Sequence, residues 1–152
     1  MLGTFGARSF AAMANYVNLD KYSRNALDLM SKEIRQCNSL KLAEQNYLWF
    51  ENSDGGDLLY YYFPSSRTLY RYTKAAAAAS WKVDAKPLLD QCDYLKFSIF
   101  QRNPILGTYD QYPTASADTC KLVQLSWICS RRLIGNKNTE SVQSAKVVIR
   151  KK

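Results

Sequence analysis

One amphipathic pattern near the N-terminus constrains the fold of this chain more than any other feature. From about Ser9 to Cys37, apolar residues recur at steps of three and four, the spacing of one helix face. Its members are Phe10, Met13, Val17, Leu27, Met30, Ile34 and Cys37. A helix over this segment would be roughly 45 Å long, more than a domain of this size can cover. We therefore expect part of the helix to project, and we expect Phe10, Met13, Val17, Leu27, Met30 and Ile34 to dock it.

Strand patterns replace the helical period after Leu40. Apolar and β-branched runs are separated by turn clusters rich in Gly, Pro, Asn, Asp and Ser. The expected strands are residues 46–51, 58–63, 68–73, 86–89 (short), 94–101, 121–130 and 142–150. The first three, with their tight turns, predict an antiparallel meander. The long link at 102–119 suggests a role such as partner contact. No function is assigned to the five alanines at 75–79.

Length and composition fit a single domain with one modest core. The chain has 152 residues, of which 47% are hydrophobic and 13% aromatic. We expect one domain over residues 1–152, with a helical spine at 1–40 and an antiparallel β region at 46–152. The predicted fold class is α+β, in which the long N-terminal helix packs on an antiparallel sheet.

Four cysteines are spaced unlike a zinc knuckle, and strand geometry limits how they can pair. Cys120 and Cys129 bracket one expected strand, so about nine steps separate them by roughly 30 Å, whereas a disulfide needs Cα atoms within ~7 Å. A hairpin would bring Cys92 and Cys129 to the same end, and this is the preferred bridge. A bulge is needed to align their faces. Cys37 and Cys120 are left to bond or to stay as thiols. Buried thiols in a reducing compartment are the alternative to the favoured oxidising one.

The residue types needed for common enzyme chemistry are missing. The chain has no histidine, which removes histidine-dependent triads, general bases and metal sites. It also has no phosphate-binding glycine motif. Asp54 and Asp57 could bind calcium, but the remaining oxygen ligands are lacking, and a hairpin turn at residues 52–57 is the favoured interpretation. We expect no enzyme activity, no metal and no cofactor.

The chain is basic, with a formal net charge of +8. Basic residues cluster near the C-terminus, at Arg131, Arg132, Lys146, Arg150, Lys151 and Lys152. This end could attract nucleic acid, although aromatic residues are not interleaved with the charges as in single-strand grooves. Nucleic-acid binding is therefore kept as the less favoured possibility. No apolar run of ~18 residues could span a bilayer, and Arg8 and Asn15 interrupt the Ala-rich start expected of a signal peptide.

Three segments carry a family resemblance. They are residues 23–36 (SRNALDLMSKEIRQ), residues 97–104 and the ending at 141–152. Together with the long helix followed by strands, they resemble type IV pilin-like proteins, and most of all the J-type minor pseudopilins of type II secretion. The leader and apolar anchor of that family have no counterpart in residues 1–8, and the helical pattern starts abruptly, so we expect an upstream portion to be missing here.

The resemblance implies a structural pilin or pseudopilin subunit with a pilin-like fold. It also implies processing by a prepilin peptidase, other pilin or pseudopilin subunits as partners, and a periplasmic or cell-surface location with an inner-membrane anchor. Two alternatives remain open: a DNA-binding minor pilin used in DNA uptake, and a secreted adhesin-like module that binds through the 102–119 loop and exposed tyrosines.

Overall fold

The N-terminal segment forms one helix in the computed structural model, α1 (Gly3–Gln36). The helix begins before Phe10, the first residue of the apolar pattern, and it ends before residue 40, the expected end of the helical spine at 1–40. The next strand, β1 (Ser39–Ala43), already takes part in a sheet. The helix stops there because the Asn38 amide donates to the carbonyl of Glu51, at 2.9 Å, instead of continuing the helical ladder. The β region therefore starts before residue 46.

The structure describes residues 3–102, 111–132 and 138–149. For residues 3–16, 131–132 and 138–139 it describes the backbone alone. The side chains of Phe10, Met13, Arg131 and Arg132, residues 150–152 and residues 103–110 of the 102–119 link therefore lie outside the described part of the chain.

The first sheet is a five-stranded antiparallel meander. After β1 it contains β2 (Tyr47–Glu51), β3 (Asp57–Phe63), β4 (Thr68–Lys74) and the short β5 (Lys82–Val83), in the order of the chain. The expected strands at 46–51, 58–63 and 68–73 match β2, β3 and β4 closely. At the turn between β2 and β3, Gly55 has φ +86°, a backbone conformation that favours glycine.

The second sheet is four-stranded and also antiparallel. It contains β6 (Cys92–Arg102), β7 (Gln111–Pro113), β8 (Cys120–Arg132) and β9 (Asn138–Val148), in the order β7-β6-β8-β9. A short 3₁₀ helix, η1 (Ala117–Thr119), precedes β8. The expected strand at 86–89 is wrong, because this segment makes only an isolated bridge between Leu89 and Leu69. Pro87 has no amide hydrogen to give to a ladder.

The expected fold class, a long helix packed on an antiparallel sheet in a pilin-like α+β arrangement, is wrong. Strands make up 53% of the structure, which is mostly antiparallel β. They form two separate sheets rather than one. The break falls between β5 and β6, where Gln91 takes a positive φ of 56° and the chain starts a new sheet at Cys92.

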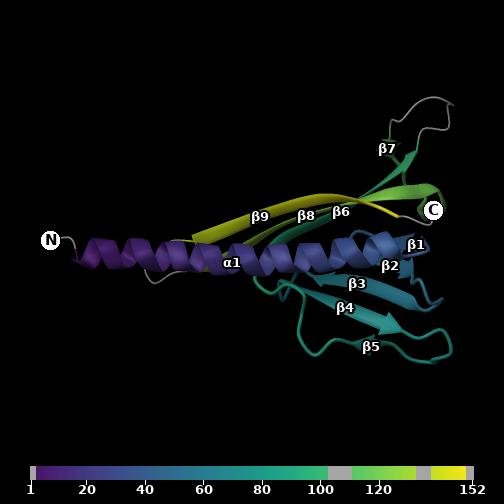
Figure 1. Cartoon of the computed structure of the whole chain (residues 1–152), viewed down its shortest axis with the longest axis horizontal. Coiled ribbons are helices and arrows are strands. Elements are labelled where there is room, and N and C mark those ends of the chain that lie inside the picture. The colour runs from purple at the N-terminus through teal and green to yellow at the C-terminus, as the bar shows by residue number, and fades with distance from the viewer. Residues whose placement is uncertain (1–2, 103–110, 133–137, 150–152) are drawn as a thin grey trace.

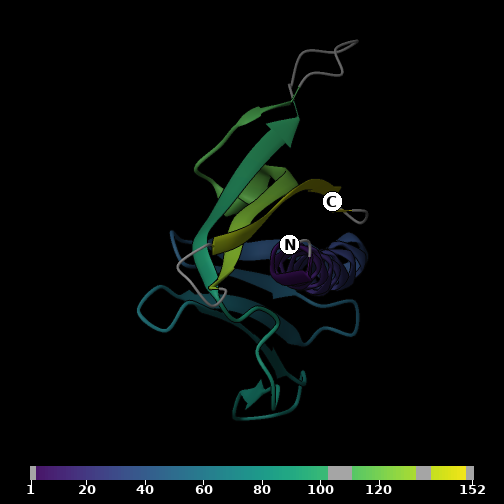
Figure 2. The same cartoon turned by 90° about the vertical axis from the view of Figure 1, so that its left-hand side faces the viewer.

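The buried side chains come from both sheets and from part of α1. Figure 1 shows β9, β8 and β6 on one side of the helix and β3, β4 and β5 on the other, and the end-on view in Figure 2 shows the same order. The largest fully buried side chains include Trp127 of β8, Tyr60 of β3, Phe50 of β2 and Met30 of α1. One continuous core therefore joins the two sheets around the C-terminal part of the helix.

Candidate functional site

The described side chains of α1 are buried on one face of the helix. Of the residues expected to dock the helix, Leu27, Met30 and Ile34 are buried in the core, whereas Val17 is 54% exposed. Leu19, which is outside the expected stripe, is fully buried. The side chains of Phe10 and Met13 lie outside the described part of the chain. Among the described side chains of α1, Leu19 is therefore the first that is buried, and Val17 lies on the opposite face of the helix.

The N-terminal turns of α1 extend beyond both sheets. Figure 1 shows the purple end of the helix continuing past the last strand, β9, with no other helix or strand of the described residues beside it. A helical segment without packing is marginally stable in water. This part of the chain is therefore the one that gains most from a partner.

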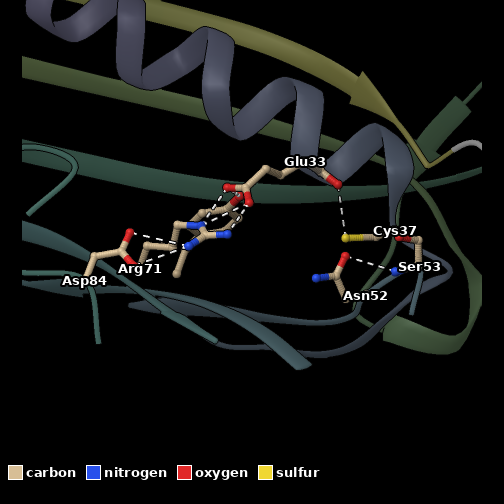
Figure 3. A network of polar contacts seen from close by, with 7 residues as sticks. Glu33, Cys37, Asn52, Ser53, Arg71 and Asp84 are labelled. Carbon is tan, nitrogen blue, oxygen red and sulfur yellow. Dashed lines mark hydrogen bonds and ion pairs between the residues drawn. The ribbon is translucent and has the colours of Figure 1, made fainter. Parts of the chain in front are cut away.

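A charged network joins the helix to the first sheet at the other end of α1 (Figure 3). The guanidinium of Arg71, on β4, donates from Nη2 to Glu33 Oε2 at 2.5 Å and from Nε to Glu33 Oε1 at 2.9 Å. Arg71 Nη1 also donates to Asp84, at 3.3 Å. The paired, charge-assisted geometry fixes the helix over β4.

Tyr60 belongs to the same network. Its hydroxyl donates to Glu33 Oε1 at 2.9 Å. Burial, followed by the neighbouring Glu33 carboxylate, raises the pKa of Tyr60 well above its ordinary value. The hydrogen bonds that Arg71 donates to Glu33 raise the pKa of Arg71, and desolvation partly opposes this effect. Both shifts favour the charged guanidinium of Arg71 and the neutral phenol of Tyr60.

A second polar contact joins the helix to the other sheet. Asp20 Oδ1 accepts hydrogen bonds from Ser141 Oγ at 3.0 Å and from Gln143 Nε2 at 2.8 Å, both on β9. Its other oxygen pairs with Arg24 at 2.7 Å. Asp20, which interrupts the apolar stripe in the sequence, is therefore used in docking.

The cysteines preferred for a disulfide lie directly opposite each other. Cys92 and Cys129 are register partners in β6 and β8. An irregularity between Cys92 and Tyr94 supplies the bulge that aligns the two faces. Both residues are buried, and no disulfide joins them in the structure. Interaction with the neighbouring Cys129 thiol, followed by burial, raises the pKa of the Cys92 thiol. Residues opposite each other in antiparallel strands have Cα atoms ~4.5–5.5 Å apart, within disulfide range.

The other two cysteines are also buried. Cys37 ends the helical stripe, and its thiol donates to the carbonyl of Glu33 at 3.2 Å (Figure 3). Burial, with a smaller effect of the Glu33 carboxylate, raises the pKa of Cys37 to about 12. Cys120 begins β8, so it and Cys129 occupy distant positions of one strand. As at the first pair, no disulfide joins Cys37 to Cys120.

Oxidation is expected to link Cys92 to Cys129 selectively. With oxidised glutathione as the acceptor, the two thiols lose two electrons and two protons and form one S–S bond. Proteolysis followed by mass spectrometry should give a linked Cys92–Cys129 peptide, and Cys92→Ser should leave Cys129 open to alkylation after unfolding. A linked Cys92–Cys120 peptide, or alkylation of both Cys92 and Cys129 in the oxidised protein, would contradict this pairing.

The turn considered for calcium uses its carboxylates internally. Asp54 Oδ1 accepts the amide hydrogen of Gly56 at 2.9 Å. Asp57 pairs with Lys41 at 2.6 Å and accepts from the Trp49 indole at 3.0 Å. Burial alone would raise the pKa of Asp57. The hydrogen bonds from Lys41 and Trp49 outweigh this effect, so the pKa of Asp57 is lowered. Within the described residues, no three histidine, cysteine, aspartate or glutamate side chains are grouped to hold a metal ion.

No protein family model and no curated protein matches this chain. In the part of the chain that the structure describes, no helix has both the length and the apolar character needed to cross a membrane.

The sequence interpretation missed the charged network and Leu19. A signal for the network is present in β4, where Arg71 shares the strand face of Leu69 rather than that of Tyr70 and Tyr72. A charged residue on a core-facing position requires a partner. Glu33, three residues after Met30 on the helix, supplies it.

Proposed function

We propose that this chain is a non-catalytic structural subunit of a pilus-like filament or of a type II secretion pseudopilus. The supporting observation is the extension of α1 past both sheets. The helix is packed at Leu19 and at several later positions, while its N-terminal turns continue past the last strand (Figure 1). A projecting helix is suited to contacts between subunits.

The sequence of the projecting turns fits this role. It includes Phe10 and Met13 at helical spacing with Val17. A row of apolar residues on a projecting helix is suited to packing against another helix. The proposed partners are therefore the corresponding helices of other pilin or pseudopilin subunits.

The remaining parts of the proposal follow from the resemblance to pilin-like proteins. The subunit would be processed by a prepilin peptidase and would act in the periplasm or at the cell surface, held at the inner membrane. The two sheets would face away from the packed helices.

Site-specific photo-crosslinking tests the proposal in cells that make the full assembly. Benzoylphenylalanine placed at Val17 is expected to give crosslinks to another subunit of the assembly, because Val17 is exposed and lies next to the turns of α1 that extend past the sheets. The matched control is Val83, a valine of similar exposure (50%) on β5. It should give several-fold less of the same product. Equal yields at the two positions, or no subunit crosslink from Val17, would contradict the proposal.

A further inference from the structure

One side of α1 is not covered by either sheet. In Figure 1 no strand of the described residues lies in front of the helix, and Figure 2 shows the same side of the helix at the right, clear of both sheets. The exposed residues from Val17 to Gln36 recur at steps of three and four along this side, opposite the buried ones. They include Lys21, Arg24, Asp28, Leu29, Lys32 and Arg35. We call this surface the open side of α1.

Cations dominate the open side of α1. Four of them form one row along about 21 Å of helix, and we call Lys21, Arg24, Lys32 and Arg35 the basic stripe. Arg24 pairs with a carboxylate of the same helix, Asp20, at 2.7 Å. Among the described residues, the other three cations make no ion pair. The stripe therefore carries positive charge that the described part of the fold does not neutralise.

The basic stripe is continuous with the turns of α1 that extend past the sheets. Val17, which is exposed, lies one turn before Lys21 on the same side of the helix. Leu29, also exposed, flanks the stripe near its other end. A partner that packs along the projecting turns and continues along α1 would meet apolar side chains first and cations next. This inference therefore rests on the proposed function and concerns the partner of the same helix.

A second copy of this chain does not complement the basic stripe. The helix has three carboxylates, and two of them, Asp20 and Glu33, are used in contacts to β9 and β4. Within the described residues, only Asp28 is left without an ion pair on α1. Two copies would place cation rows against each other, and like charges that face each other across an interface are unfavourable. The net charge of +8 adds to this repulsion.

A nucleic acid fits the open side of α1 less well than a protein does. Its phosphates would meet the Asp28 carboxylate within the row of cations. Among the described side chains, none of the exposed residues on this side has an aromatic ring on which a base could stack. Exposed Leu29 and Val17 are instead placed beside the charges. Apolar and charged side chains mixed on one surface are typical of contacts between proteins.

We propose that the basic stripe binds a carboxylate-rich surface of a different subunit in the same assembly. The lysine and arginine side chains would donate charge-assisted hydrogen bonds to Asp and Glu side chains of that subunit. Val17 and Leu29 would add apolar contacts beside the charges. Complementary charge rows favour the correct partner and penalise a partner of like charge. The stripe would thus direct this chain to an acidic subunit rather than to copies of itself.

Benzoylphenylalanine placed at Leu29 reports on contacts of the basic stripe, in cells that make the full assembly. Irradiation is expected to join this position to one other kind of subunit, at a segment rich in Asp and Glu that mass spectrometry of the product identifies. Washing the extracted assembly with high salt before irradiation should lower the yield, because salt screens exposed charge pairs.

Charge reversal tests the chemistry of the contact. Lys21→Glu combined with Lys32→Glu should lower the yield of the Leu29 product about fivefold or more, because attraction to the partner becomes repulsion. Lysine in place of the carboxylates of the crosslinked partner segment should restore the product with this variant. The matched control is Lys82→Glu with Lys86→Glu, which makes the same charge change at two exposed lysines on and after β5. It should leave the yield unchanged.

The outcomes separate this inference from the proposed function. A subunit crosslink from Val17 without one from Leu29 would overturn the inference and leave the proposed function in place, whereas the absence of both crosslinks would overturn both. A Leu29 product that contains a second copy of this chain or a nucleic acid would also overturn the inference. So would a yield that charge reversal in the stripe leaves unchanged, with circular dichroism establishing that each variant is folded.

Discussion

Replacing Leu19 by alanine is expected to lower the free energy of unfolding by about 3–4 kcal/mol. The Leu19 side chain is fully buried, so its removal loses apolar burial and leaves a cavity. Urea unfolding measures the change as a lower midpoint at a constant slope.

Leu29→Ala is the control on the same helix. Leu29 is 43% exposed, and its truncation should cost less than about 1 kcal/mol. A large difference between two leucines of one helix would show that packing of α1 reaches Leu19. Equal effects of the two replacements would contradict the packing of α1 at Leu19.

Replacing Glu33 by alanine is expected to destabilise the protein by about 3 kcal/mol. The change leaves Arg71 partly buried without its main carboxylate partner, and it leaves the fully buried Tyr60 hydroxyl without its acceptor. Chemical denaturation at neutral pH gives the magnitude.

Two comparisons isolate the cause. Arg24→Ala removes an exposed ion pair with Asp20 and should cost less than about 1 kcal/mol. The double variant Glu33→Met with Arg71→Met removes both charges together and should recover much of the loss, because no buried charge is left unpaired. If Glu33→Ala has no larger effect than Arg24→Ala, the network does not hold the helix to the sheet.

The sequence predicts local elements well where the residue pattern is itself local. Alternating residues and glycine-rich turns give β2, β3 and β4 nearly to the residue, and the step of three and four gives α1. The opposition of Cys92 and Cys129 also follows from hairpin geometry together with one bulge.

The sequence does not predict which strands share a sheet. Alternation marks the buried face of a strand, but it is the same whether that face meets a neighbouring sheet or a helix. The division into two sheets depends on the segment from Asp84 to Gln91, which combines Pro87 with a positive φ at Gln91. A prediction of one sheet missed this break.

The charged contacts were missed for a similar reason. Glu33 and Asp20 look like ordinary surface residues of a helix with mixed charges. Their partners, Arg71 and Gln143, are far away in the sequence, so only the assembled fold brings them together. The cross-strand row of Tyr47, Tyr61 and Tyr70 likewise forms only once β2, β3 and β4 are paired in register.

The two polar contacts of α1 have a mechanical consequence. Asp20 holds the helix to β9 of one sheet, and Glu33 holds it to β4 of the other. Tension applied at the N-terminal end of α1 along its axis would therefore load both sheets in shear, through two separate attachment points. Both polar contacts would have to break before the helix could slide out of the domain.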